Sequence, residues 1–167
     1  MKLSLPFLHK PKDNYLTLSF SILAAEAAGG VGSLFTLSAI PTWYAHLDKP
    51  FYSPPNWVFG PVWTMLYALM GISAYLVWRK WQFGKKAHAF WHVYGTQLAL
   101  NALWSILFFG CKYIGLAFVE ILAMWYFIVR CIQESKKLSP WASYLLYPYI
   151  AWVSFATLLN FGIMILN

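Results

Sequence analysis

Long runs without charged residues make up most of this chain, and the charged positions fall between them. Five runs are wholly or almost uncharged: 14–47 (only Glu26), 50–78, 87–111, 113–129 (only Glu120) and 138–167. A helix needs about 20 mainly apolar residues to cross the hydrocarbon core of a bilayer. Prolines early in the second run delay its helix, whereas Pro140 suits a helix's first turn. The pattern therefore predicts five membrane-spanning helices, at about 16–40, 58–78, 88–111, 113–131 and 140–166.

The apolar residues do not alternate with polar ones, which excludes a membrane β-barrel. Barrel strands are about 10 residues long and alternate strictly, whereas LALNALWSILFFG (98–110) shows no such period. The composition agrees, because 60% of the 167 residues are hydrophobic, only 10% are charged and the mean hydropathy is +0.56. Soluble domains carry about 25% charged residues, and disordered chains are poor in hydrophobic ones. We therefore predict an all-α membrane protein, a bundle of five transmembrane helices with a lid loop between helices 1 and 2.

Basic residues predict the orientation of the bundle. Of the twelve, ten lie on one side of a five-span chain: Lys2, Lys10, Lys12, Arg79, Lys80, Lys85, Lys86, Arg130, Lys136 and Lys137. Cytoplasmic loops carry the excess of lysine and arginine, so the N-terminus is expected in the cytoplasm and the C-terminus outside. The net charge of +7 then reflects topology, and no nucleic-acid partner is expected. Residues 1–15 are predicted to be an N-terminal extension rather than a signal peptide, and residues 16–167 the membrane domain.

Few side chains suggest catalysis or metal binding. The sequence holds no phosphate loop, zinc helix motif or nucleophile elbow. His88 and His92 are four residues apart and could together bind a metal or haem iron, but such a pair is more often solvated at the interface. No metal site and no cofactor are expected. Glu26 and Glu120 lie within spans, where a carboxylate costs roughly 2.5–3.5 kcal/mol, so a function is the default interpretation. The alternatives are that either side chain is protonated or faces a polar seam between helices. Neither has a basic partner at its depth, so no proton-relay role is assigned.

Aromatic, amide and small residues repeat at helical spacing on three spans. The shared faces are Trp63 and Tyr67 on the second span, Gln97, Asn101 and Trp104 on the third, and Tyr149, Trp152 and Ala156 on the fifth. Turned inward, these faces would line a cavity with flat aromatic walls and a few hydrogen-bond donors. The alternative is an aromatic belt at the membrane interface, which suits Trp57 or Trp141 better than the tryptophans within spans.

Small residues recur every fourth position in the first span and again in the third. The positions are Ala24, Ala28 and Gly32; Ala25, Gly29 and Ser33; and Gly95 and Ala99. Such faces let helices approach closely. They indicate either packing within one bundle or a homodimer through helix 1 or helix 3.

Three stretches carry a more distinctive pattern, at 43–71, 97–110 and 145–160. The first contains W-Y-x-x-L-x-K-P-x-x-x-P-P and the third L-x-P-Y-x-x-W-x-x-F-A-T. Together they resemble the TspO/MBR translocator proteins, a family that includes the mitochondrial peripheral benzodiazepine receptor. The resemblance implies a five-helix bundle in lipid, with a cavity roofed by the loop between the first two helices and a porphyrin or haem-type tetrapyrrole as ligand.

One departure from the family pattern concerns sterols. Animal members also bind cholesterol through an apolar–Tyr–basic pattern near the C-terminus. Here Phe161 stands where that tyrosine would fall, and no basic residue follows Lys137. Such motifs are weak evidence, but the departure favours a bacterial, tetrapyrrole-linked member.

The resemblance also implies which residues bind the ligand. They are Ser33, Tyr44, Pro54, Trp63, Tyr67, Asn101, Trp104, Trp152 and Ala156. Trp63 and Trp152 match cavity tryptophans linked to light-dependent porphyrin breakdown, and are candidate catalytic residues only if this chain carries out that reaction. Lys49 in the loop is a candidate partner for a porphyrin propionate. We expect a membrane receptor or sensor for tetrapyrroles; the alternatives are an enzyme of light- or oxygen-dependent porphyrin degradation, and a transporter of porphyrin or sterol-like ligands.

Overall fold

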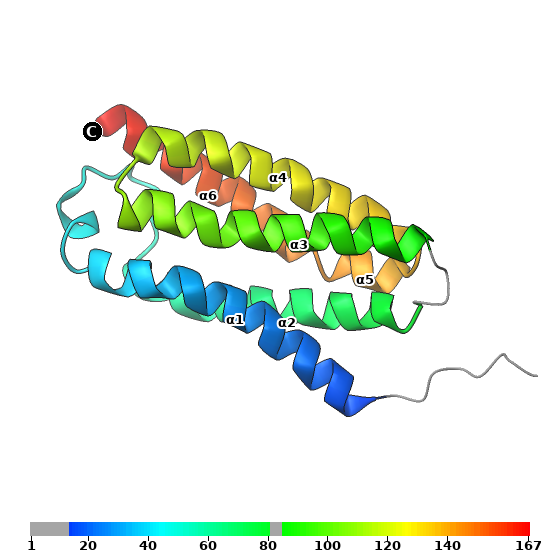
Figure 1. Ribbon diagram of the computed structural model, residues 1–167. Coiled ribbons are helices and arrows are strands. Elements are labelled where there is room, and N and C mark those ends of the chain that lie inside the picture. Colours follow the sequence, from blue (N-terminus) through cyan, green and yellow to red (C-terminus); the bar gives the residue numbers. More distant parts are fainter. Residues whose placement is uncertain (1–13, 81–84) are drawn as a thin grey trace, which may run out of the picture.

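The described part of the chain folds into one bundle of long helices lying side by side (Figure 1). The computed structural model describes residues 14–80 and 85–167, so the predicted N-terminal extension lies almost wholly outside the described residues. The helices are α1 (Tyr15–Ala39), α2 (Phe59–Trp78), α3 (Lys85–Ser105), α4 (Ile114–Lys136), the short α5 (Pro140–Tyr144) and α6 (Tyr147–Leu166). Within these described residues, five stretches are long and apolar enough to cross a membrane. The prediction of an all-helical, five-span bundle is confirmed.

The last predicted span consists of two helices, because the chain turns at Leu145 and Leu146. Ser139 caps α5 by accepting a hydrogen bond from the Ala142 N–H, with Pro140 in the first turn. Pro148 occupies the first turn of α6. Proline lacks an N–H and disfavours helical geometry in the residue before it, so it begins a new helix where the apolar pattern alone is continuous.

The fourth helix is longer than its uncharged run, since α4 continues to Lys136 instead of ending near residue 131. Glu134 in its last turns lies 2.6 Å from the Lys137 ammonium and 3.8 Å from the Arg130 guanidinium. Pairs at spacings of three and four residues stabilise a helix. The helix therefore continues through charged residues at which the hydropathy pattern predicts that it ends.

Small residues allow α1 to approach its neighbours closely, since it packs against α2 and α3. A Cβ added at Gly71 of α2 would lie 2.5 Å from the Cα of Ile22, and one added at Gly32 would lie 2.9 Å from the Ser105 hydroxyl. Gly29 likewise faces the ring of Tyr67. The Gly29 and Gly32 positions of the small-residue pattern on α1 therefore serve packing within the bundle.

The end of α3 is a π-helical turn, labelled η4 (Ile106–Gly110). The Cys111 N–H donates to the Ile106 carbonyl at 2.8 Å, which closes the wider turn. Single π-turns are rare and often adjoin functional sites. This one brings Phe108 and Phe109 to the end of the bundle that carries the lid loop.

The loop between α1 and α2 covers that end of the bundle and is fastened to α6. It contains two short 3-10 turns, η1 (Tyr44–His46) and η2 (Asn56–Val58). The Tyr52 hydroxyl donates to the Leu158 carbonyl at 3.1 Å. The Asp48 N–H donates to the Asn167 side chain at 3.1 Å, and the Asn167 amide donates back to the Asp48 carbonyl at 3.0 Å. The loop therefore lies beside the C-terminus, as Figure 1 shows.

Candidate functional site: an aromatic cavity under the lid loop

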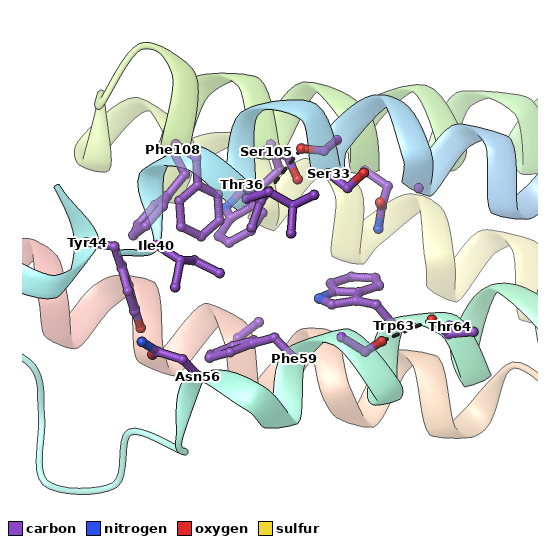
Figure 2. Close-up of a pocket in the computed structure, with 18 of the residues that line it drawn as sticks. Ser33, Thr36, Ile40, Tyr44, Asn56, Phe59, Trp63, Thr64, Ser105 and Phe108 are labelled. Atoms are coloured by element: carbon purple, nitrogen blue, oxygen red, sulfur yellow. Dashed lines mark hydrogen bonds between the residues drawn. The ribbon is translucent and has the colours of Figure 1, made fainter. Parts of the chain in front are cut away.

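A cavity of about 470 Å³ lies within the bundle beneath the lid loop (Figure 2). Side chains from α1, α2, α3 with η4, and α6 form its walls. In Figure 2, Trp63 projects inward from α2, across the cavity from Ser33 and Thr36 of α1, while Tyr44 lies at the lid end. Sites for small molecules typically have volumes of about 300–1,000 Å³ and mainly apolar walls. This cavity has the size and character of such a site.

Aromatic rings form flat faces on opposite walls of the cavity. Trp63 stacks on Tyr67 with ring centroids 5.5 Å apart and planes 28° from parallel, as expected for residues one turn apart. Across the cavity, Trp104 stacks on Phe108 at 5.1 Å and 20°. Trp152 of α6 meets Phe59 edge to face at 6.0 Å. These faces suit a flat aromatic ligand, because stacking and edge contacts add to the energy of apolar burial.

A chain of hydrogen bonds connects three helices at the inner end of the cavity. The Tyr67 hydroxyl donates to the side-chain oxygen of Asn101, and the Asn101 amide donates to the Tyr149 hydroxyl at 3.1 Å. Tyr149 in turn donates to the side-chain oxygen of Gln97 at 2.8 Å. All four side chains are at most 7% exposed. Because buried polar groups are costly unless paired, this chain fixes the rotation of α2, α3 and α6 relative to one another.

A second amide positions the tryptophan of α3. The Trp104 indole donates to the Asn160 side-chain oxygen at 3.1 Å, and the Asn160 amide donates to the Ile114 carbonyl at 3.1 Å. The buried indole nitrogen of Trp152 has no hydrogen-bond partner among the described residues. Asn160 therefore fixes the orientation of the Trp104 indole, whereas the Trp152 indole N–H can donate to another acceptor.

The lid end is closed by Tyr44, which is 3% exposed and packs against Phe108 and Phe109. Burial raises the pKa of its phenol, so the hydroxyl stays a neutral donor at physiological pH. The Lys49 ammonium lies 4.9 Å from the Tyr44 ring centre and donates to the Leu47 carbonyl at 3.0 Å. Lys49 therefore adds positive charge to the lid without lining the cavity.

The cavity is open on the side where α1 meets α2. Several of its lining residues there are also exposed at the outer surface, namely Gly30, Leu37, Trp57, Gly60 and Thr64. None of the lining residues from α3, η4 or α6 is exposed. In a bilayer this open side faces lipid rather than water.

Eight of the nine residues implied by the resemblance line this one cavity. They are Ser33, Tyr44, Trp63, Tyr67, Asn101, Trp104, Trp152 and Ala156. Pro54 lies in the lid loop and does not line the cavity. Sequence reasoning missed Asn160 and Phe108 as lining residues, although Asn160 falls four positions after Ala156 on the same helical face and offered that signal. It also gave no role to Glu26, which lines the cavity from α1.

The remaining histidine, acidic and cysteine side chains of the spans lie away from the cavity. His88 and His92 are exposed on α3. Glu120 is buried on α4, and neither of its oxygens has a hydrogen-bond partner within the described ranges 14–80 and 85–167. Cys111 is exposed and Cys131 buried, and both are free thiols. None of these five side chains lines the cavity.

Fold and cavity together define a multi-pass helical membrane protein with an aromatic site inside the bundle. A model of the TspO/MBR family matches residues 21–166. The chain is 46% identical over 156 residues to "Tryptophan-rich protein TspO" of Archaeoglobus fulgidus, covering 92% of this chain and 99% of that protein. It is 43% identical over 140 residues to human "Translocator protein" (83% of each chain), and 39% identical over 141 residues to "Tryptophan-rich sensory protein" of Cereibacter sphaeroides (84% and 87%). The chain belongs to the TspO/MBR family, as its motifs predict, and is an integral membrane protein.

Proposed function

We propose that the protein binds a tetrapyrrole of the porphyrin or haem type in the cavity under the lid loop, as a receptor or translocator for that ligand. The observation that carries the proposal is the pair of stacked aromatic faces on opposite walls, Trp63 with Tyr67 and Trp104 with Phe108. A porphyrin is a flat apolar macrocycle with polar propionates, so it needs such faces and polar groups at its rim. The relatives named translocator and sensory proteins fit this role.

Binding is tested by titrating the purified protein with protoporphyrin IX in the dark and following the porphyrin absorption band. Removing one aromatic face by Trp63→Leu costs about 0.5–1.5 kcal/mol, which weakens the Kd about two- to tenfold. Trp141→Leu is the matched control, because Trp141 is 73% exposed on α5 and lies outside the cavity. An unchanged band in the parent protein would exclude porphyrin binding. Equal Kd values for the two variants would place the ligand elsewhere.

A second candidate function is light-dependent breakdown of the bound porphyrin. Trp63 and Trp152 are two of the four tryptophans that line the cavity, and the Trp152 indole nitrogen has no partner within the described residues. Illumination of the complex separates this function from binding alone: an enzyme bleaches the band, and Trp63→Phe and Trp152→Phe slow the bleaching. Bleaching at the parent rate in both variants would leave the tryptophans with a binding role only.

We further propose that the N-terminus faces the cytoplasm and that the protein forms homodimers through α3. The basic residues at the ends of α2 and α4 favour this orientation. On α1, Gly29 and Gly32 already pack within the bundle, whereas Gly95 and Ala99 of α3 are exposed and a Cβ at Gly95 would meet nothing within 4 Å. Cross-linking through a Gly95→Cys variant in membranes tests the dimer, with Gly30→Cys on α1 as the comparison.

A further inference from the structure

One acidic side chain distinguishes the inner part of the cavity from its other walls. Glu26 lines the cavity together with Gly29, Gly30 and Ser33, which follow it at spacings of three, four and seven residues on the same face of α1. It lies about 17 Å along the helix from Tyr15 and about 20 Å from Ala39, at 1.5 Å per residue. Glu26 therefore lies near the middle of the span.

A carboxylate at this depth needs a compensating partner, because charge in the hydrocarbon region is costly. Among the described side chains, no lysine, arginine or histidine forms an ion pair with Glu26. The Tyr67 hydroxyl in the same part of the cavity donates its proton to Asn101, so it does not neutralise the carboxylate. None of the lining residues is a lysine, arginine or histidine.

One aromatic ring lies a helical turn from Glu26. The ring of Tyr67 packs against Gly29, one turn from Glu26, and stacks on Trp63. Because Tyr67 is only 7% exposed, the Glu26 carboxylate, rather than a ring face, is the group available to an ammonium ion at this end of the cavity. At the opposite end of the site, Lys49 adds positive charge to the lid, so the two ends differ in sign.

We infer that Glu26 forms a subsite for a cationic amine on the cavity ligand. This inference rests on ligand binding in the cavity and adds to it the charge and orientation of the ligand. An amine at this end pairs with Glu26, and carboxylates on the same ligand lie toward Lys49. Glu26 is then a specificity-determining residue that selects amine-bearing flat ligands over neutral ones.

Two probes that differ only in charge test the subsite. Protoporphyrin IX, with one propionate as its methyl ester, is coupled through the other propionate either to ethylenediamine, which leaves a terminal ammonium, or to propylamine, which ends in a methyl group of similar size. The Kd of each is measured in the dark for the parent protein, Glu26→Gln and Glu120→Gln. Glu120→Gln is the matched control, because Glu120 is the other acid within a span and lies outside the cavity. The ratio of the two Kd values cancels differences in how the probes partition into lipid or detergent.

The parent protein and Glu120→Gln are expected to bind the ammonium probe about tenfold more tightly, and Glu26→Gln is expected to bind both probes equally. An unchanged Kd for the methyl probe in Glu26→Gln shows that its cavity is intact. The inference is overturned if the parent protein does not distinguish the probes, or if Glu26→Gln still does. If neither probe binds the parent protein, ligand binding itself is refuted, and the amine subsite with it.

Discussion

The contact between α1 and α2 at Gly71 gives the sharpest prediction for stability. A Cβ at this position would lie 2.5 Å from the Cα of Ile22 and 2.8 Å from its nitrogen and from the Ser21 carbonyl oxygen. Ordinary contacts of a Cβ lie at 3.4–4 Å, so Gly71→Ala forces α1 outward by about 1 Å. The atoms it meets belong to the backbone, and no side-chain rotation relieves the clash.

Overpacking of this kind costs about 1–3 kcal/mol, and the better helix propensity of alanine returns up to about 1 kcal/mol. The midpoint of these ranges, a net loss of about 1.5 kcal/mol, lowers the Tm by about 3–6 °C for a chain of this size. The measurement is thermal unfolding of detergent-solubilised protein, followed by tryptophan fluorescence. Gly95→Ala is the control, because its Cβ would meet nothing within 4 Å. Because α1 also forms one cavity wall, the affinity for protoporphyrin IX is expected to fall in Gly71→Ala alone.

Equal Tm values for the two alanine variants would refute the close approach of α1 and α2. A lower Tm with unchanged porphyrin affinity would support the close contact but show that it does not affect the cavity wall. Gly71→Ser distinguishes a steric effect from a loss of flexibility, since serine adds the same Cβ and is expected to destabilise at least as much.

Three further substitutions test the site and the turn beside it. Asn101→Ala leaves the buried Tyr67 hydroxyl without its partner, while Tyr149 keeps its bond to Gln97, and is expected to cost about 1–3 kcal/mol, measured by thermal unfolding. Gly29→Ala places a methyl group against the Tyr67 ring and is expected to weaken porphyrin binding. Gly30→Ala has open space around its Cβ, so it is expected to leave the Tyr67 ring in place and the porphyrin Kd within about twofold of the parent value. Lys112 has a φ of 61°, so Lys112→Gly is expected to raise the free energy of unfolding by up to about 1 kcal/mol; a fall would show that the lysine side chain stabilises the turn.

The span count could be predicted from sequence because charge is nearly absent from the spans. A lysine or arginine in hydrocarbon costs so much that the few basic residues mark the helix ends. The method fails where charge and helix coexist, as at Arg130 and Glu134, which pair within α4. Charge and hydropathy also miss the break before Pro148, where apolar character continues but the backbone starts a new helix. The proline itself predicts this break, because a proline within a span loosens or kinks the helix.

Helical spacing grouped Trp63 with Tyr67 and Asn101 with Trp104, but it could not pair residues between helices. That Asn101 accepts from Tyr67 and donates to Tyr149 depends on how three helices are rotated about their axes. This rotation follows from close approaches such as Gly29 against Tyr67, which a single sequence does not specify. Glu26 was missed as a cavity residue for the same reason. Its spacing to Ser33 places the two residues on one face of α1, but the sequence does not show which face of α1 points into the bundle.

The site has two boundaries that are held in different ways, and this separates their roles. The lid loop is tied to α6 through Tyr52 and through the pair of Asp48 and Asn167. Small-residue contacts mainly hold the α1 wall against α2. Only 11% of the residues in the apolar 18-residue stretch of α1 are buried within the bundle. Hydrophobic association does not drive helices together in lipid, where packing of small residues and hydrogen bonds must do so. Of the two boundaries, the α1 wall is therefore the one that close packing controls, and its small residues set both the width of the open side and the position of Glu26.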